Sequence, residues 1–333
     1  MRIFWEGILM DQKAYLRIYE PEAGLPYGDF SLFLPAGDAY AEYRFVYEQN
    51  PVNPELPFNK GPNDPANRSF YRIKTAWIVR QDGEWFVPMF RALQSGEIGL
   101  ALREQGAGDF VGGLHGDENL TAVSLWLGDR QLPLDEPFFG CAEGFRFEES
   151  SRISRCNTPD HILMLHDQTY TLDGNTLRLA QSVKWVADAM EIQSAFMPML
   201  TVQRLDPADT RRILTDTVEL YAPDGTLVGS FDTSPYGTVG NPNAKGDDTI
   251  GVLRNTFATS AKVYGKNGGL CVEGGYTVLD NSIPAEQIST NLLIRFMPHT
   301  LDNKVYFRIW AGEGPKAGTH WKSDVFYRIS YRR

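Results

Sequence analysis

The chain has 333 residues, of which 42% are hydrophobic and 12% aromatic, enough for one large core or for two ordinary domains. Its formal net charge of −10 argues against non-specific binding to nucleic acid or to an anionic membrane surface, because both are themselves negatively charged. The three cysteines include no Cys-x-x-Cys pair, so we expect neither a disulfide framework nor a zinc site. Free thiols are expected, with a single Cys141–Cys156 bridge as the alternative.

The N-terminal residues Met1–Ile8 do not form a basic segment followed by a long apolar run and a small-residue cleavage site. No stretch of the sequence is apolar for long enough to span a bilayer. We therefore expect a cytoplasmic protein, or a secreted one if a signal peptide has been removed from the sequence.

Turn signals separate short alternating segments along most of the chain. Asp-Gly and Asn-Gly pairs supply the positive φ angles of tight hairpins, and four such turns are predicted, at Asp82-Gly83, Asp173–Asn175, Pro223–Gly225 and Asn267–Gly269. Many strands with short turns indicate an all-β protein, a large antiparallel β-sandwich of the supersandwich or jelly-roll type with few short helices.

A few segments depart from this rhythm. A short helix is predicted over Phe90–Gln105, although two glycines weaken it. Asn50–Asn67 and Ser230–Asp248 are rich in Pro, Gly and Asn and predict long irregular loops, which are as often surface excursions as functional elements. We expect one sandwich unit over residues 1–333, with a soft seam near residue 160 as the only candidate boundary.

The most unusual segment is Gly108–Glu118, where four glycines surround a histidine and three acidic residues. His115 can transfer a proton near neutral pH, and Asp117 and Glu118 can orient it, act as bases or bind a cation. An extended backbone would place His115 and Asp117 on one face and Glu118 on the other, unless a tight glycine turn intervenes. The alternative is a demanding turn whose polar groups cap neighbouring strands.

A second polar group is predicted on the strand that contains His161 and His166. The odd spacing places the two imidazoles on opposite faces, so they do not bind one metal from this strand alone. His166, Gln168 and Tyr170 share a face and predict a polar cleft wall, with a structural histidine as the competing interpretation of His166.

Cations and aromatic rings for substrate binding are expected on the later strands. Over Lys304–Trp310, period-two alternation places the apolar residues on one face and Lys304, Tyr306, Arg308 and Trp310 on the other. The candidate substrate-binding residues are Lys184, Trp185, Arg308, Trp310 and Trp321. No cofactor is required by any motif, and a divalent cation has no supporting ligand spacing.

Two sequence elements resemble the galactose mutarotase-like β-sandwich group, over roughly residues 108–200. These are Gly112–Gly116, which reads Gly-Gly-Leu-His-Gly, and the hairpin Tyr170–Leu179, which reads Tyr-Thr-Leu-Asp-Gly-Asn-Thr-Leu-Arg-Leu. The resemblance implies an antiparallel supersandwich, a fold that hosts sugar epimerases, polysaccharide lyases and sugar-binding units. It also implies that His115 lies in a cleft as a proton donor or ligand-binding group.

The sequence departs from the epimerase pattern of that group at two places. Asp117-Glu118 stands where an apolar or Arg-bearing stretch is usual, and Ala195–Met199 stands where a second His followed by Tyr-Phe-Asn is usual. The favoured function is therefore β-elimination on an oligosaccharide or polysaccharide, with His115 or His166 as base and Tyr170 as acid. The alternatives are a glycoside hydrolase with paired carboxylates, a non-catalytic carbohydrate-binding or structural protein, and a sugar epimerase. The sequence leaves the oligomeric state open.

Overall fold

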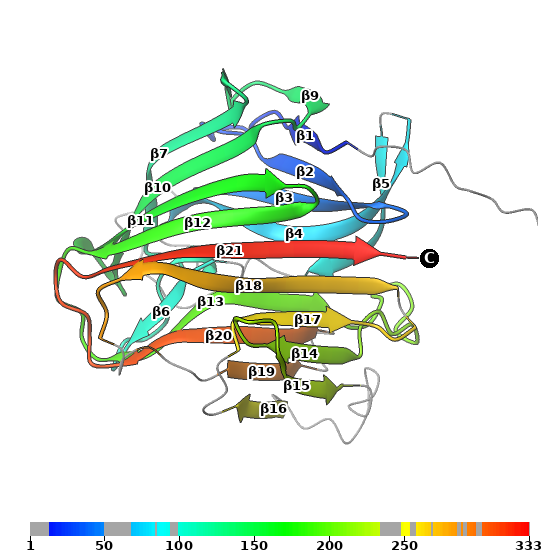
Figure 1. Ribbon diagram of the computed structural model, residues 1–333. Coiled ribbons are helices and arrows are strands. Elements are labelled where there is room, and N and C mark those ends of the chain that lie inside the picture. Colours follow the sequence, from blue (N-terminus) through cyan, green and yellow to red (C-terminus); the bar gives the residue numbers. More distant parts are fainter. Residues whose placement is uncertain are drawn as a thin grey trace, which may run out of the picture.

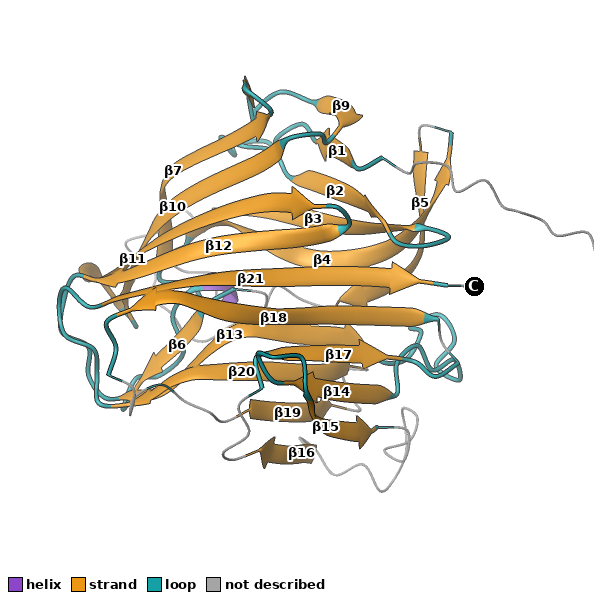
Figure 2. Ribbon diagram, viewed as in Figure 1, coloured by secondary structure: helices purple, strands orange, loops and turns teal. Residues whose placement is uncertain are grey.

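The computed structural model describes residues 13–49, 68–83, 85–93, 99–233, 248–253, 258–267, 269–284, 288, 292–297 and 302–332. Within these residues the chain forms twenty-one β-strands and one 3-10 turn, which confirms the expected all-β class (Figures 1 and 2). None of the described residues belongs to a helix of the length and apolarity that a membrane crossing needs. The expected loop Asn50–Asn67 lies outside the described residues, as does most of Ser230–Asp248.

The strands pair in two long runs that face each other as the layers of a sandwich (Figure 1). In pairing order, the front run contains β8 (Arg130–Leu132), β7 (Glu118–Leu127), β10 (Phe145–Arg155), β11 (Thr158–Asp173), β12 (Thr176–Trp185), β21 (His320–Tyr331), β18 (Leu270–Asn281), β17 (Ser260–Tyr264), β14 (Thr217–Tyr221) and β15 (Leu227–Asp232). All of these ladders are antiparallel, as the short turns in the sequence predict.

The back run contains, again in pairing order, β9 (Phe138–Cys141), β1 (Tyr15–Ile18), β2 (Phe30–Pro35), β3 (Tyr40–Gln49), β4 (Ser69–Asp82), β5 (Trp85–Leu93), β13 (Ile192–Gln203), β20 (Asp302–Gly312), β19 (Leu292–Met297) and β16 (Asp248–Leu253). A further short strand, β6 (Ala101–Glu104), also pairs with β13. One parallel bridge, between Ser69 and Asn119, connects β4 of this run to β7 of the other.

The four hairpins predicted from glycine-containing turns are confirmed. They join β4 to β5, β11 to β12, β14 to β15 and β17 to β18. Their glycines, Gly83, Gly174, Gly225 and Gly269, have φ between 59° and 83°, a region that residues with a Cβ rarely enter. The expected seam near residue 160 falls inside β11, which hydrogen-bonds to β10 and β12.

The helix predicted over Phe90–Gln105 is wrong in its described part. Phe90–Leu93 ends β5, and Ala101–Glu104 forms β6, where Ala101 and Leu102 pair with Phe196 and Ala195 of β13. Strand pairing and burial override the weak local helix propensity here.

Aromatic rings from both runs interdigitate in the core. Phe45 of β3 lies 5.1 Å from Tyr170 of β11 between ring centroids, and Phe30 of β2 lies 4.9 Å from Phe147 of β10. Burying one such ring stabilises the fold by about 1.5–3 kcal/mol, so these cross-layer contacts hold the two runs together. The three cysteines are free thiols, so the alternative Cys141–Cys156 bridge is not formed.

Candidate functional site

The glycine-rich segment folds into a tight turn directly before β7. Gly112, Gly113 and Gly116 have φ of 89°, 52° and 84°, and Asp117 has 53°. A Cβ on Gly112 would lie 2.7 Å from the Leu100 carbonyl oxygen, so the close approach of the two backbones requires glycine. The 3-10 turn Gly113–His115 closes through a hydrogen bond from the Gly116 N–H to the Gly113 carbonyl, at 3.1 Å. The extended-backbone expectation for His115 and Asp117 therefore does not apply.

His115 lies at the edge of this turn, partly open to solvent. Its side chain is 16% exposed, and its Nδ1 stands 3.8 Å from Oδ1 of Asp109, a carboxylate that is 17% exposed. The Asp109 carboxylate also accepts the Phe110 backbone N–H at 2.8 Å, which fixes its orientation. An imidazole beside a carboxylate is an arrangement that proteins use for proton transfer.

Aromatic rings continue from His115 onto the face of β13 and β20 that points away from the core. The ring of Phe110 lies 5.0 Å from the His115 ring and 6.0 Å from Phe196, which lies 5.6 Å from Tyr306. Phe196 and Tyr306 belong to a small cluster separate from the main core. They are only 8% and 7% exposed, so they back the site while Phe110 and His115 border solvent. We call Asp109, Phe110, His115, Phe196 and Tyr306 together the His115 surface.

Positive charges adjoin this surface. Lys304 Nζ lies 5.7 Å from the Tyr306 ring, and Arg103 Cζ lies 5.8 Å from the Phe110 ring. Arg308 is paired with Phe196 across the β13–β20 ladder and donates from Nη2 to the Gln193 carbonyl. Partial burial lowers the pKa of its guanidinium from the ordinary 12.5, and arginine remains charged at neutral pH.

Three of the expected substrate-binding residues lie in the core instead. Trp185, Trp310 and Trp321 are fully buried and pack edge to face, at 4.9 Å for Trp185–Trp310 and 5.3 Å for Trp310–Trp321. The alternation expected over Lys304–Trp310 fails at Trp310, because the β13–β20 register is irregular beside Ala195, its partner. These rings stabilise the sandwich and are not accessible to a sugar in this conformation.

Lys184 is exposed, but on the other layer of the sandwich. It lies on β12, in register with His320 of β21, in the front run. Phe196 and Tyr306 of the His115 surface lie on β13 and β20 of the back run. Of the five expected substrate-binding residues, Arg308 alone adjoins the His115 surface.

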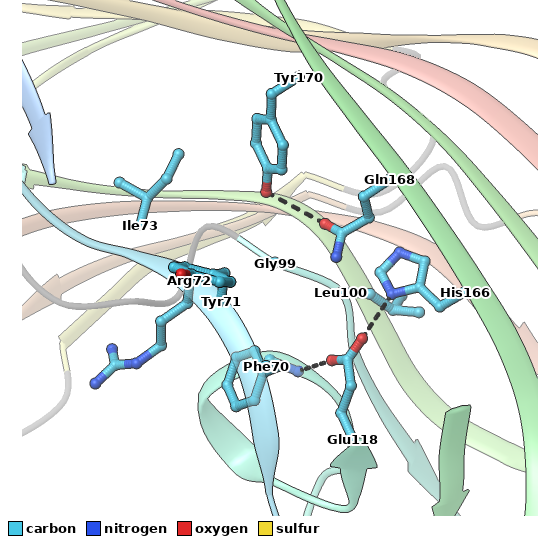
Figure 3. A pocket seen from close by; sticks show the side chains of 11 residues that line it. Phe70, Tyr71, Arg72, Ile73, Gly99, Leu100, Glu118, His166, Gln168 and Tyr170 are labelled. Carbon is cyan, nitrogen blue, oxygen red and sulfur yellow. Dashed lines mark hydrogen bonds and ion pairs between the residues drawn. The ribbon is translucent and has the colours of Figure 1, made fainter. Parts of the chain in front are cut away.

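Glu118, His166 and Tyr170 are brought together, but between the two layers (Figure 3). His166 Nδ1 lies 2.9 Å from Glu118 Oε1, and the two side chains are 1% and 2% exposed. The Tyr170 hydroxyl donates to Gln168 Oε1 at 3.2 Å. They line a cavity of about 20 Å³, which has room for about one water molecule and not for a sugar ring. His166 and Tyr170 therefore share a polar wall as predicted, facing the interior.

The two buried carboxyls of this interior group differ in acidity. Burial favours the neutral form of Glu118, but the His166 hydrogen bond and charge, the Ser151 hydroxyl and the Gly113 N–H together lower its pKa below the ordinary value. Burial, and then the negative charge of Glu118, raises the pKa of Glu149 well above its ordinary value. Glu118 is thus the more acidic of the two carboxyls.

Asp117 is a structural residue of the turn. It is fully buried, and its carbonyl accepts the Ser154 N–H at 2.7 Å. Its Oδ2 accepts the Asn157 N–H at 3.2 Å, which caps the hairpin between β10 and β11. This matches the alternative in which the acidic groups of the segment cap neighbouring strands.

Sequence reasoning missed most of the His115 surface. Asp109 was visible as the third acidic residue of the glycine-rich segment, and Tyr306 lay on the correctly predicted outer face of its strand. Phe196 lies in Ala195–Met199, the segment where the epimerase pattern has its second His, but alternation did not mark its ring, because this part of β13 is irregular. In the residues that the structure describes, no three His, Cys, Asp or Glu side chains are grouped so as to hold a metal ion.

No protein-family model matches this chain, and no curated protein matches it significantly. Similar solved structures include the Slr1438 protein of Synechocystis sp. PCC 6803, with 10% identity, a TM-score of 0.40 and coverage of 94% of this chain and 98% of that one. The GalM/aldose epimerase homologue of C. elegans has 12% identity, a TM-score of 0.37 and coverage of 97% and 100%. A putative aldose 1-epimerase of Escherichia coli K12 has 11% identity, a TM-score of 0.37 and coverage of 92% and 100%.

Two of these three structures carry an aldose epimerase description. Identity and TM-score are too low for the likeness to carry an argument about activity. The function must therefore be argued from the side chains of this chain.

Proposed function

We propose that this chain acts on a carbohydrate and that it does so at the His115 surface. The observation that carries the proposal is a partly exposed imidazole paired with Asp109, on a turn fixed by glycines and next to Phe110. A proton-transfer group beside an aromatic ring and cations is the combination that a sugar-processing site uses, with rings for the apolar sugar faces and charges for polar groups.

The reaction we favour is β-elimination from a uronic acid residue. His115 takes the proton from C5, the electron pair of that bond forms a C4–C5 double bond, and the bond from C4 to its oxygen breaks. The leaving oxygen then takes the proton back from the imidazolium, so one imidazole serves as base and then as acid. Asp109 stabilises the imidazolium, and Arg308 or Lys304 offsets the uronate carboxylate. Tyr170, sealed in the core, has no role in this scheme.

Paired-carboxylate hydrolysis has less support. Asp117 and Glu118 are almost completely buried and both are engaged by backbone or side-chain donors. Of the three acidic residues in the glycine-rich segment, Asp109 is the partly exposed one, and it lies beside His115. A second candidate, non-catalytic carbohydrate binding, is favoured by the Phe110 ring and the neighbouring cations, which suit a sugar whether or not His115 reacts.

The test is a panel of uronate-containing and neutral glycans incubated with the purified full chain, H115Q and H161Q. His161 is a partly exposed imidazole on β11, outside the His115 surface, and H161Q is the matched control. Ultraviolet absorbance from a new C=C bond is expected with the wild-type chain and H161Q and not with H115Q. Sugar binding without turnover would favour the non-catalytic candidate, and a changed ring configuration without new mass would favour an epimerase. Turnover retained by H115Q would overturn the site.

A further inference from the structure

A line of buried hydrogen bonds runs from the His115 turn into the core (Figure 3). The Gly113 N–H, at the start of the turn, donates to Glu118 Oε2 at 2.6 Å. The other oxygen, Oε1, receives the Ser151 hydroxyl at 2.6 Å and His166 Nδ1 at 2.9 Å. His166 Nε2 faces Gln181 Oε1 at 3.4 Å, so both ring nitrogens face oxygen acceptors.

The two carboxylate oxygens of Glu118 bind different parts of the chain. One oxygen is anchored in the front run by β10 and β11, and the other holds the backbone of the turn that carries His115. Burying a charged pair is expensive, and apolar residues of similar volume often stabilise a core equally well. Stability alone therefore does not account for the buried Glu118–His166 pair. Glu118 also binds the backbone of the turn, through the Gly113 N–H.

We propose that Glu118 is a positioning residue: its carboxylate, held by His166 and Ser151, fixes the Gly113–His115 turn and thereby sets the place of the His115 imidazole. The proposal rests on the proposed function of the His115 surface for its effect on turnover. Its effect on the imidazole itself does not need a substrate. Misplacing a reacting group by about 1 Å can cost on the order of 100-fold in rate.

The chain offers a matched control in Glu149. Its carboxyl lies in the same interior, where Oε1 accepts the Tyr71 N–H at 2.7 Å and Oε2 lies 3.5 Å from Gln168 Nε2. Both of these partners lie outside the Gly113–His115 turn, and burial raises the pKa of Glu149 well above its ordinary value, so an amide there changes the charge of the core less than one at Glu118. E149Q therefore perturbs the same core without touching the Gly113–His115 turn.

The experiment compares E118Q and E149Q by NMR of the histidine rings in the absence of sugar, and by kcat and KM with the glycan that the panel identifies. In E118Q the His115 ring signals are expected to move, and kcat to fall on the order of 100-fold with KM within about tenfold. E149Q is expected to leave the His115 signals and kcat as in the wild-type chain. Circular dichroism checks that both variants are folded.

A milder variant, S151A, provides the test if E118Q does not fold. S151A removes one donor to Glu118 and is expected to move the His115 signals in the same direction by less. Unchanged His115 signals in folded E118Q, or in S151A where E118Q does not fold, would overturn the proposal, as would equal changes in E149Q. If no glycan is turned over, the NMR comparison still decides the positioning role, so the two proposals fail separately.

Discussion

Two histidines of this chain each stand beside a carboxylate, in opposite surroundings. His166 lies 2.9 Å from Glu118 with both side chains almost completely buried, and around them is space for about one water. His115 lies 3.8 Å from Asp109 with both side chains partly exposed, beside Phe110. Both pairs join an imidazole to a carboxylate, and they differ in how far each side chain is exposed.

The comparison shows that the same two side-chain types behave differently when their burial differs. Inside the sandwich, low polarity strengthens the ion pair and makes the loss of one partner costly. At the edge, both side chains of the His115–Asp109 pair keep some contact with water, which weakens the attraction between them. Glu118 joins the two regions, because it binds His166 with one oxygen and the His115 turn with the other.

The largest expected effect is on stability, from breaking the sealed pair. H166A leaves the buried Glu118 carboxylate without the Nδ1 partner 2.9 Å away and should lower the free energy of unfolding by about 3–5 kcal/mol. H115A, at the edge, should change it by about 0.5 kcal/mol or less. Urea unfolding of the two variants measures the difference, and equal losses would erase the distinction between the two histidines.

A similar loss is expected from the tryptophan cluster. W310A removes a fully buried ring that contacts Trp185 and Trp321, at a cost of about 3–5 kcal/mol. If these rings are core and not a sugar platform, the folded variant should keep the wild-type saccharide affinity. Calorimetric titration below the unfolding temperature checks this. A selective loss of affinity in a folded W310A would return Trp310 to the binding site.

A smaller effect is expected at the exposed side of the comparison. F110A removes the partly exposed ring next to His115, and losing about 1 kcal/mol of ring contact weakens saccharide affinity about fivefold. Phe139, a ring 38% exposed on β9, provides the control F139A, which should bind as the wild-type chain does. Equal affinity of F110A and the wild-type chain would contradict the assignment.

The smallest effect concerns Glu149, the neutral carboxyl of the core. Its pKa is raised above the ordinary 4.5, so the folded chain keeps a proton that the unfolded chain releases as pH rises past that value. Stability is therefore lost with rising pH, and E149Q, which has no such proton, should be more stable than wild type at neutral pH. The advantage should shrink to nothing below about pH 4.5, as thermal unfolding at several pH values would show. An advantage that grows on acidification would refute the assignment.

The sequence predicted more of the fold than of the site. Asp-Gly and Asn-Gly pairs predicted the four hairpins, because turn chemistry is local. Val305, Phe307 and Ile309 were correctly predicted as core from alternation. Trp310 and Phe196 were not predictable, because both lie beside irregularities in the β13–β20 register, which tertiary pairing creates. His166 and Tyr170 share a face as predicted. The period-two alternation of a strand does not show whether a polar face is exposed to water or packs against the other layer of the sandwich.

Histidine-ring NMR during saccharide titration tests the central claim most directly, because one spectrum reports on both regions. The five histidines are assigned by single substitutions, and the glycan identified by the panel is added stepwise. The His115 signals should move with saturation while those of His166 stay in place. Movement of His166 with His115 unchanged would contradict the account.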